Sequence, residues 1–446
     1  MQIKQFEDKS LAHFSYAILS ASTKKIVLID PSRDPAPYLN FAKENNAEIT
    51  IIIETHPHAD FVSSHLELHQ TTGATIYTSK LVGATYPHKN FDQGDHLQIG
   101  KIKLSAVNTP GHSPDSICIV LEHDDVQKAV FTGDTLFIGD CGRPDLREQE
   151  GELSTGRFEL GKQMYHSLRN ELMVLSDETI VYPAHGAGTL CGKALSKANS
   201  STIGKEKATN WCLQTQTEDE FVEELLKDQS FIPVYFPFDV ALNKKGAPAF
   251  KTSVDAINIE QLSDAVNLDS TIWIIDIRKE NIYKDGHLPK SINLMEGDKM
   301  ETWLGSIIQP NEAFYLIGDN LTSLSAVVER VAAIGYELQI KGAFLIQNGK
   351  IKSNKIDLNL FNANEEQYTI IDVRNREEAN DKKIFAGSLS FPLGELRMNV
   401  GHIPTDKPIV VHCAGGYRSA AASSFLQSEL KDKLKVFDLG EAVKLH

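Results

Sequence analysis

The chain has 446 residues, more than a single hydrophobic core usually accommodates, so we expect two or three domains. Its net charge of −15 disfavours nucleic acid and anionic membranes as partners. The polar N-terminus and short apolar runs predict neither a signal peptide nor a membrane-spanning segment. Five cysteines without a framework spacing are typical of free thiols in a reducing compartment, which predicts a soluble, cytoplasmic protein.

Four motifs in the N-terminal half each follow a β-like run and carry histidine or aspartate. The first comes directly after the apolar run 51–53, and the others follow runs that end near residues 107, 131 and 181. Side chains at successive strand ends can converge on one point, as in metal sites built on sheets. A single histidine in such a place is more often structural, but four motifs in this order predict a metal site. The candidate residues are His56, His58, Asp60, His112, Asp134 and His185.

This order of motifs resembles the metallo-β-lactamase fold, an αββα sandwich, over about the first half of the chain. Relatives that bind two metals, such as glyoxalase II, carry a first motif His-x-His-x-Asp-His. This chain has Phe61 in place of the last histidine. Because a phenyl ring cannot ligate a metal, the departure favours one metal over two.

The relatives with one metal are the persulfide dioxygenases. Resemblance to them implies one Fe(II) per chain, held by His56, His112 and Asp134. Two histidines and one carboxylate on one face of the metal leave coordination positions open for a substrate sulfur and O₂. The same resemblance therefore implies oxygen chemistry rather than hydrolysis.

The remaining candidates would lie around these ligands. His58, Asp60 and His185 would orient the ligands or hydrogen-bond the substrate. The segment 133–145 also resembles that group, in which a Gly-Arg-x-Asp turn follows the metal aspartate, so we expect Arg143 near the charged end of the substrate. The alternative for Arg143 is an ordinary salt bridge.

The C-terminal half contains an internal repeat. Residues 273–278 read Trp-Ile-Ile-Asp-Ile-Arg and are echoed by Thr-Ile-Ile-Asp-Val-Arg at 369–374, while 314–319 align with 409–413. Short buried strands that alternate with helical patterns are typical of parallel sheets covered on both faces. The repeat therefore predicts two α/β domains.

Cys413 opens a glycine-rich segment, Cys-Ala-Gly-Gly-Tyr-Arg-Ser, directly after a strand-like run. Backbone N–H groups at Gly415 and Gly416, together with Arg418, can converge on the sulfur at a helix N-terminus and stabilise a thiolate. The alternative is a buried structural cysteine. The segment resembles the active-site loop of the rhodanese (sulfurtransferase) family, in which the cysteine carries a persulfide. Both copies resemble rhodanese domains, but Asp319 stands where Cys413 stands, so the first copy should be inactive.

The domain order resembles fused persulfide dioxygenase–sulfurtransferases of sulfide detoxification, over the whole chain. The fold class is therefore α/β: a metallo-β-lactamase αββα sandwich at 1–250, an inactive rhodanese domain at 251–352 and an active one at 353–446. The resemblance implies that a low-molecular-weight thiol persulfide and O₂ give sulfite, and that sulfite takes sulfur from a Cys413 persulfide to give thiosulfate. We leave open whether the chain forms a homo-oligomer.

The competing hypothesis is a zinc-dependent thioester hydrolase, similar to glyoxalase II, with an accessory sulfurtransferase domain. The ligand set does not decide between them, because the same residues bind Zn²⁺ more tightly than Fe²⁺. A third hypothesis is a non-enzymatic sulfur carrier or sensor, which the convergent histidines and aspartates disfavour.

Overall fold

The structure is a computed structural model that describes residues 1–146, 156–193, 195–263, 268–430 and 434–446. The chain divides into two compact units. Unit 1 comprises Met1–Thr252 with Ala333–Gly335, and unit 2 comprises Ser253–Ala332 with Tyr336–His446. The predicted domain limits at 250/251 and 352/353 stay predictions. No helix among the described residues is both long and apolar enough to cross a bilayer.

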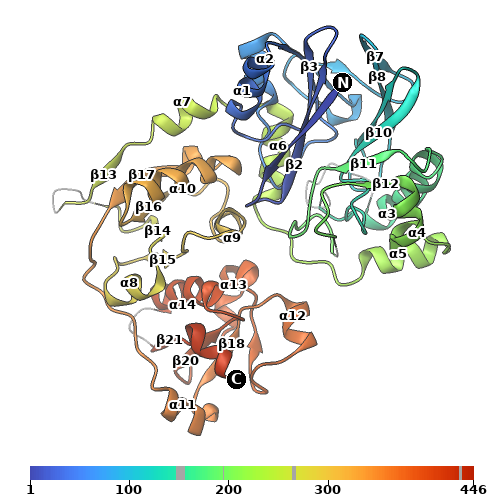
Figure 1. The fold of residues 1–446 in the computed structure, drawn as a ribbon. Helices are drawn as coiled ribbons and strands as arrows, with labels where there is room; N and C mark the ends of the chain where they lie inside the picture. The colour runs from blue at the N-terminus through green and yellow to red at the C-terminus, as the bar shows by residue number, and fades with distance from the viewer. Residues whose placement is uncertain (147–155, 194, 264–267, 431–433) are drawn as a thin grey trace. The chain divides into compact units, whose positions relative to one another are not determined.

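Unit 1 is built on two six-stranded sheets, ordered β1-β2-β3-β4-β5-β6 and β12-β11-β10-β9-β8-β7 (Figure 1). The strands of the first sheet are β1 Gln2–Asp8, β2 His13–Ser20, β3 Lys25–Ile29, β4 Glu48–Ile53, β5 Thr75–Thr78 and β6 Lys89–Asn90. Those of the second sheet are β7 His96–Ile99, β8 Ile102–Asn108, β9 Ile117–His123, β10 Val126–Gly133, β11 Ile180–Pro183 and β12 Ser201–Thr202. The helices of unit 1 are α1 Ala36–Glu44, α2 His65–Thr72, α3 Arg157–His166, α4 Ile203–Thr209, α5 Glu218–Leu226 and α6 Phe236–Lys245, and α7 Phe250–Asp255 begins in unit 1 and ends in unit 2.

Three apolar clusters define the layers of unit 1. The central cluster joins side chains of both sheets, for example Tyr16 of β2 and Leu104 of β8. A second cluster packs the first sheet against α1 and α2, with Phe41 and Ile52 among its members. Strand β4, Glu-Ile-Thr-Ile-Ile-Ile, is apolar on both faces because one face meets the other sheet and the other meets helices.

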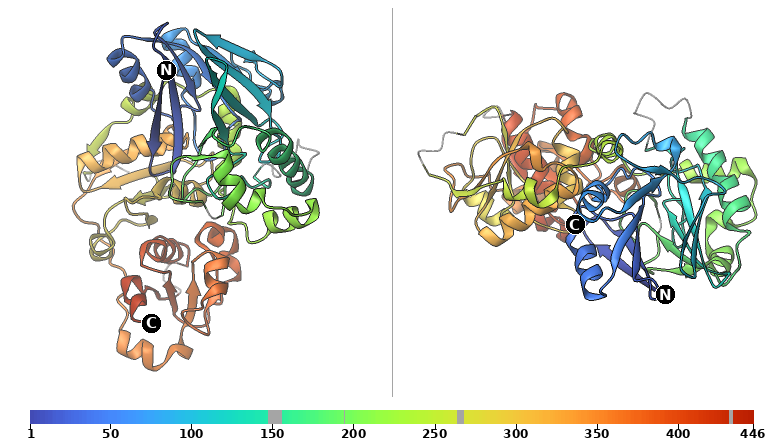
Figure 2. Two further views of the ribbon diagram at one scale, coloured as in Figure 1. Left: turned by 45° about the vertical axis from the view of Figure 1, so that its right-hand side comes forward. Right: turned by 90° about the horizontal axis from the view of Figure 1, so that it is seen from above.

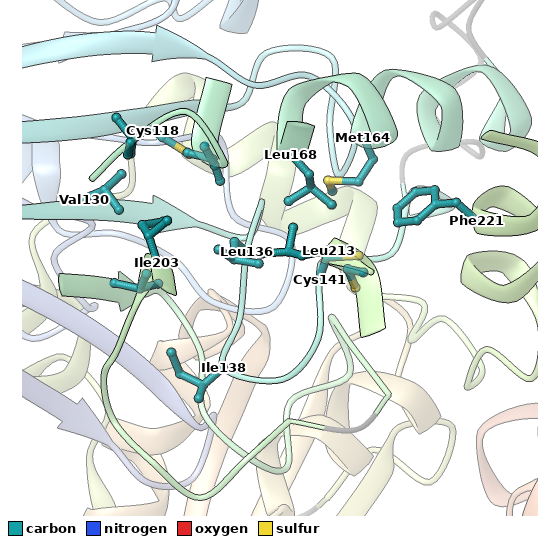
Figure 3. Close-up of a cluster of buried hydrophobic side chains, with 14 of the residues drawn as sticks. Cys118, Val130, Leu136, Ile138, Cys141, Met164, Leu168, Ile203, Leu213 and Phe221 are labelled. Carbon is teal, nitrogen blue, oxygen red and sulfur yellow. The ribbon is translucent and has the colours of Figure 1, made fainter. Parts of the chain in front are cut away.

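The third cluster covers the outer face of the second sheet with α3, α4 and α5 (Figure 3). Val130 of β10, Met164 of α3 and Phe221 of α5 all belong to this cluster. The order helix, sheet, sheet, helix confirms the predicted αββα sandwich. The carboxyl ends of β4 and β10, which carry the first and third motifs, belong to different sheets of this sandwich.

Unit 2 holds two sheets in which every pairing is parallel, ordered β13-β17-β16-β14-β15 and β19-β18-β20-β21. Their strands and helices are the yellow to red part of the ribbon in Figure 2. We name the first sheet with its helices the first repeat and the second sheet with its helices the second repeat. The first repeat contains β13 Ile259–Gln261, β14 Trp273–Asp276, α8 Glu280–Asp285, β15 Ser291–Asn293, α9 Met300–Ile307, β16 Phe314–Gly318, α10 Leu321–Ala333 and β17 Ile340–Leu345. The second contains α11 Leu358–Ala363, β18 Thr369–Asp372, α12 Arg376–Asp381, β19 Leu389–Ser390, α13 Leu393–Asn399, β20 Ile409–His412, α14 Tyr417–Leu430 and β21 Val436–Asp438.

The two repeats match strand for strand. Trp273 pairs with Phe314 at the start of β14 and β16, and Thr369 pairs with Ile409 at the start of β18 and β20. The predicted α/β class with parallel sheets is thereby confirmed for both copies.

The Asp-x-Arg element of each copy forms the same buried ion pair. Arg278 Nη2 lies 2.7 Å from Asp276 Oδ2, and Arg374 Nη2 lies 2.6 Å from Asp372 Oδ2. Each guanidinium also donates to a backbone carbonyl eight residues farther on, at Gly286 or Lys382. The ion pair therefore anchors the segment that follows β14 in the first repeat and the segment that follows β18 in the second.

Candidate metal centre and cysteine loop

Three buried side chains converge where strands of unit 1 end. His56 follows β4, His112 lies in the loop after β8, and Asp134 directly follows β10. His56 Nε2 lies 3.8 Å and His112 Nε2 3.5 Å from Asp134 Oδ2. Their ligand atoms all lie within 4.8 Å of one another, which is close enough for one ion to contact all three.

The Asp134 carboxylate fits a bound cation. Neither of its oxygens has a hydrogen-bond partner in the described part of the chain, although both are buried. Burying a carboxylate without compensation costs several kcal/mol by order of magnitude, and a divalent cation would remove that cost. Two imidazoles and one carboxylate suit Fe²⁺ or Zn²⁺.

His56 is oriented through Thr55. The backbone N–H and the hydroxyl of Thr55 donate to the Asp30 carboxylate at 2.7 and 2.8 Å. Because that hydroxyl already donates, it accepts from His56 Nδ1 at 3.0 Å, which leaves the Nε2 lone pair facing Asp134. Gly133, with φ +50°, makes this possible, since a Cβ there would lie 2.6 Å from Thr55 Oγ1.

His112 is oriented by the backbone of Arg143. Its Nδ1–H donates to the Arg143 carbonyl at 2.9 Å, so Nε2 again carries the lone pair. Burial lowers the pKa of His112 despite the neighbouring Asp134, and the neutral imidazole is the form that binds metal. Gly142 allows this approach, because a Cβ there would lie 2.0 Å from the Asp134 carbonyl oxygen and 2.9 Å from His112 Nδ1.

The Arg143 side chain is buried in an ion pair. Its Nε and Nη2 each donate to Asp145 at 2.7 Å, and Nη1 donates to the Leu190 carbonyl at 3.3 Å. The predicted contact of Arg143 with a substrate stays a prediction. The sequence reasoning missed Asp145 as the partner of Arg143. The signal was the spacing, because Asp276/Arg278 and Asp372/Arg374 in unit 2 are ion pairs with the same two-residue separation.

The other three candidates form an adjacent group. Ligand atoms of His58, Asp60 and His185 also lie within 4.8 Å of one another. His185 Nε2 lies 3.4 Å from Asp60 Oδ2 and 3.5 Å from Asp134 Oδ1, so it connects the two groups. Burial lowers the pKa of His185, but Asp60 and Asp134 outweigh it and the pKa is raised overall.

Phe61 is enclosed by histidines. Its ring lies 3.8 Å from that of His13 and 4.3 Å from that of His58, measured between centroids. His13 was missed by the sequence reasoning because it lies at the start of β2, whereas the motifs follow the ends of strands. It is buried, its Nε2 has no hydrogen-bond partner among the described residues, and its backbone bridges to His185.

Cys191 also reaches this region. Its sulfur, a carboxylate oxygen of Asp134 and a ring nitrogen of His185 all lie within 4.8 Å of one another. Burial, followed by the Asp60 and Asp134 charges, raises the pKa of this thiol well above its usual value.

Cys413 directly follows β20, and its sulfur is cradled by the next turn. The N–H groups of Gly416 and Gly415 point to Sγ at 3.1 and 3.5 Å, and Ser419 Oγ lies 3.7 Å away. Gly416 has φ +101°, and α14 begins at the next residue. Two N–H donors at a helix N-terminus stabilise negative charge on sulfur. In the first repeat Asp319 follows β16 at the equivalent place.

Arg418 lies on α14 but is held by a carboxylate. Its Nη1 and Nη2 donate to Glu378 of α12 at 2.5 and 2.8 Å. The guanidinium holds the pKa of the Glu378 carboxyl below its usual value. Direct contact of Arg418 with a substrate sulfur stays a prediction.

Comparisons with known proteins agree with this architecture. Residues 11–185 match the metallo-beta-lactamase superfamily and residues 357–442 match the rhodanese-like domain. The bovine (Bos taurus) mitochondrial persulfide dioxygenase ETHE1 is 30% identical over 244 residues, which cover 54% of this chain and 87% of that protein. A probable hydroxyacylglutathione hydrolase of Schizosaccharomyces pombe is 31% identical over 179 residues, which cover 39% of this chain and 63% of that protein. A crystal structure of a metallo-beta-lactamase from Staphylococcus aureus superimposes with a TM-score of 0.69 at 30% identity, covering 78% of this chain and 99% of that one.

Proposed function

Because this chain belongs to the metallo-beta-lactamase superfamily and carries a C-terminal rhodanese-like domain, we propose that it is a non-haem Fe(II) persulfide dioxygenase coupled to a sulfurtransferase. The observation that carries the proposal is the group His56, His112 and Asp134, with Phe61 in place of a further histidine ligand. The likeness to persulfide dioxygenases supports it. The proposed partners are a low-molecular-weight thiol persulfide, O₂ and sulfite.

The proposed oxidation is RSSH + O₂ + H₂O → RSH + SO₃²⁻ + 2H⁺. Fe(II), when bound, supplies the electron transfer that dioxygen chemistry requires. The chain contributes two imidazoles whose Nδ1 protons are fixed by Thr55 and the Arg143 carbonyl, so that both Nε2 atoms face the metal. The chain also buries the three side chains, and electrostatic interactions are stronger there because the effective dielectric constant is lower than in water.

The proposed transfer runs through Cys413. The thiolate attacks the outer sulfur of a persulfide, the S–S bond of the donor breaks, and RSH leaves with the proton. Sulfite then attacks the outer sulfur of the Cys413 persulfide, which releases thiosulfate and restores the thiolate. The N–H groups of Gly415 and Gly416 stabilise the anionic sulfur before and after transfer.

Oxygen uptake tests the proposal. Protein reconstituted anaerobically with Fe(II) should consume one O₂ per persulfide in an oxygen electrode, and protein reconstituted with Zn(II) should consume none. An iron form that takes up no O₂ while the zinc form cleaves a thioester would refute it.

A second candidate function is zinc-dependent thioester hydrolysis. It is favoured by the group His58, Asp60 and His185, which adjoins Asp134 and leaves Asp60 Oδ1 and His185 Nε2 without hydrogen-bond partners in the described residues. The similarity to a probable hydroxyacylglutathione hydrolase points the same way. Two tightly bound zinc ions per chain, measured by elemental analysis after dialysis, would favour this candidate.

A further inference from the structure

A side chain of α6 holds the loop that carries the first metal motif. Asn243 donates from Nδ2 to the backbone carbonyls of His58 and Phe61 at 2.8 and 2.7 Å, and its Oδ1 accepts from the N–H of Ser63 at 2.8 Å. A carbonyl only accepts and a backbone N–H only donates, so these partners fix the orientation of the amide. One buried side chain thus binds three backbone groups that lie 180 to 185 positions earlier in the chain.

The same loop is also tied at its ends. Ser63 donates its hydroxyl to the Glu54 carboxylate at 2.8 Å, and Glu54 lies directly after β4 and two residues before His56. Tyr235, the residue before α6, donates its hydroxyl to the Asp60 carbonyl at 3.2 Å. The segment that contains His56 is therefore closed on itself at both ends and bound to α6 in between.

The backbone that Asn243 binds carries rings that pack against a candidate metal ligand. The His58 ring lies 4.2 Å from the His56 ring and 4.3 Å from the Phe61 ring, measured between centroids. Because these rings are in contact, a shift of the backbone at His58 or Phe61 moves the ring against which His56 packs. The hydrogen bonds of Asn243 therefore bear on the position of His56.

Helix α6 is a firm support for Asn243. Phe236 and Val240 on the same helix are buried. Gly246 ends the helix with φ +85°, and a Cβ there would lie 2.3 Å from Leu66 Cδ2, so the end of α6 packs closely against α2. A side chain on a packed helix is held more precisely than one on a loop.

We infer that Asn243 is a positioning residue for the metal centre, whose amide holds the motif loop so that His56 keeps its place beside His112 and Asp134. This inference rests on the metal group of the proposed function and deepens it. Among side chains of this size, only a carboxamide offers two donors and one acceptor here. A carboxylate of the same shape would turn both donated bonds into contacts between acceptors.

Metal binding by substituted proteins tests the inference. Asn243→Asp keeps the shape and loses both donated bonds, and Asn243→Ala removes all three bonds without burying a charge. Asn45→Asp is the control, because Asn45 caps the end of α1 and donates to the Phe41 carbonyl at 2.8 Å. Anaerobic titration gives the dissociation constant of Fe(II), and the visible absorption of bound Co(II) reports the ligand geometry without oxygen chemistry. Thermal unfolding of the metal-free proteins identifies a temperature at which they are folded.

Asn243→Asp should weaken Fe(II) binding roughly 10- to 100-fold and shift the Co(II) bands, and Asn243→Ala should act in the same direction. Asn45→Asp should leave both at the wild-type values. If Asn243→Asp does not fold, Asn243→Ala decides. Wild-type affinity and spectrum in a folded Asn243 variant, even one of lower thermal stability, would overturn the inference, and so would an equal loss in Asn45→Asp. Wild-type protein that binds Fe(II) but takes up no O₂ with persulfide would refute the proposed function, and the binding data would still decide the inference.

Discussion

Gly142→Ala should disrupt the metal centre although residue 142 offers no ligand. The added methyl would lie 2.0 Å from the Asp134 carbonyl oxygen, more than an ångström inside normal contact distance, and this oxygen belongs to the backbone and cannot rotate away. It would also lie 2.9 Å from His112 Nδ1, which must keep its hydrogen bond to the Arg143 carbonyl. The loop must therefore move by about an ångström, which separates the carbonyl from His112 and shifts Asp134.

The expected cost is about 1–3 kcal/mol of unfolding free energy from overpacking, with Fe(II) affinity reduced roughly 10- to 100-fold by loss of the orienting bond. Anaerobic Fe(II) titration and thermal unfolding of the metal-free protein measure the two effects separately. Gly156→Ala is the matched control, because nothing lies within 4 Å of its Cβ position. A Gly142→Ala protein with wild-type affinity and stability would refute the reasoning.

Four further changes test the remaining assignments. His112→Ala should abolish O₂ uptake with persulfide and leave sulfur transfer from thiosulfate to thiols intact, as separate assays of the same preparation would measure. Loss of both activities would show that the two sites do not work independently. Cys413→Ser should keep O₂ uptake but release sulfite instead of thiosulfate, as ion chromatography of the products would show, and normal thiosulfate production would disprove the role of the thiol. Asp319→Ala should change neither activity when both are assayed at equal folded concentration. Asp372→Asn breaks a buried ion pair and should cost about 3–5 kcal/mol near neutral pH. Burial raises the pKa of Asp372, but the hydrogen bonds from Arg374 and the nearby His412 outweigh burial and the pKa is lowered overall. The contribution is therefore complete above the ordinary carboxyl pKa and is lost as the pH falls through the lower folded value. Urea unfolding of wild type and Asp372→Asn should therefore converge in strongly acidic buffer, and a constant difference down to that pH would refute the assignment.

The sequence alone determined the fold class, because its evidence is local and repeated. Apolar runs ending in polar motifs predicted strands with functional residues at their ends, and the Asp-x-Arg repeat predicted two copies of one α/β fold. The glycines after Cys413 likewise predicted a cradle, since two N–H groups reach a sulfur two and three residues earlier through short-range geometry. All of these features depend on neighbours in the chain.

The tertiary structure decided where the long side chains are directed. Arginines have many rotamers, so sequence spacing could not reveal that Arg418 turns to Glu378, which lies 40 residues earlier in the chain. His13 meets Phe61 only because β2 and the segment after β4 come together, 48 residues apart in the sequence.

The contact of the first repeat with the cysteine loop is also a tertiary feature. Met295 and Tyr417 are separated by 122 positions, and no local pattern in either segment indicates that they touch. A motif shows which chemistry a residue can perform. Packing between distant segments decides which charges and surfaces surround it, because those contacts depend on the whole fold and not on spacing along the chain.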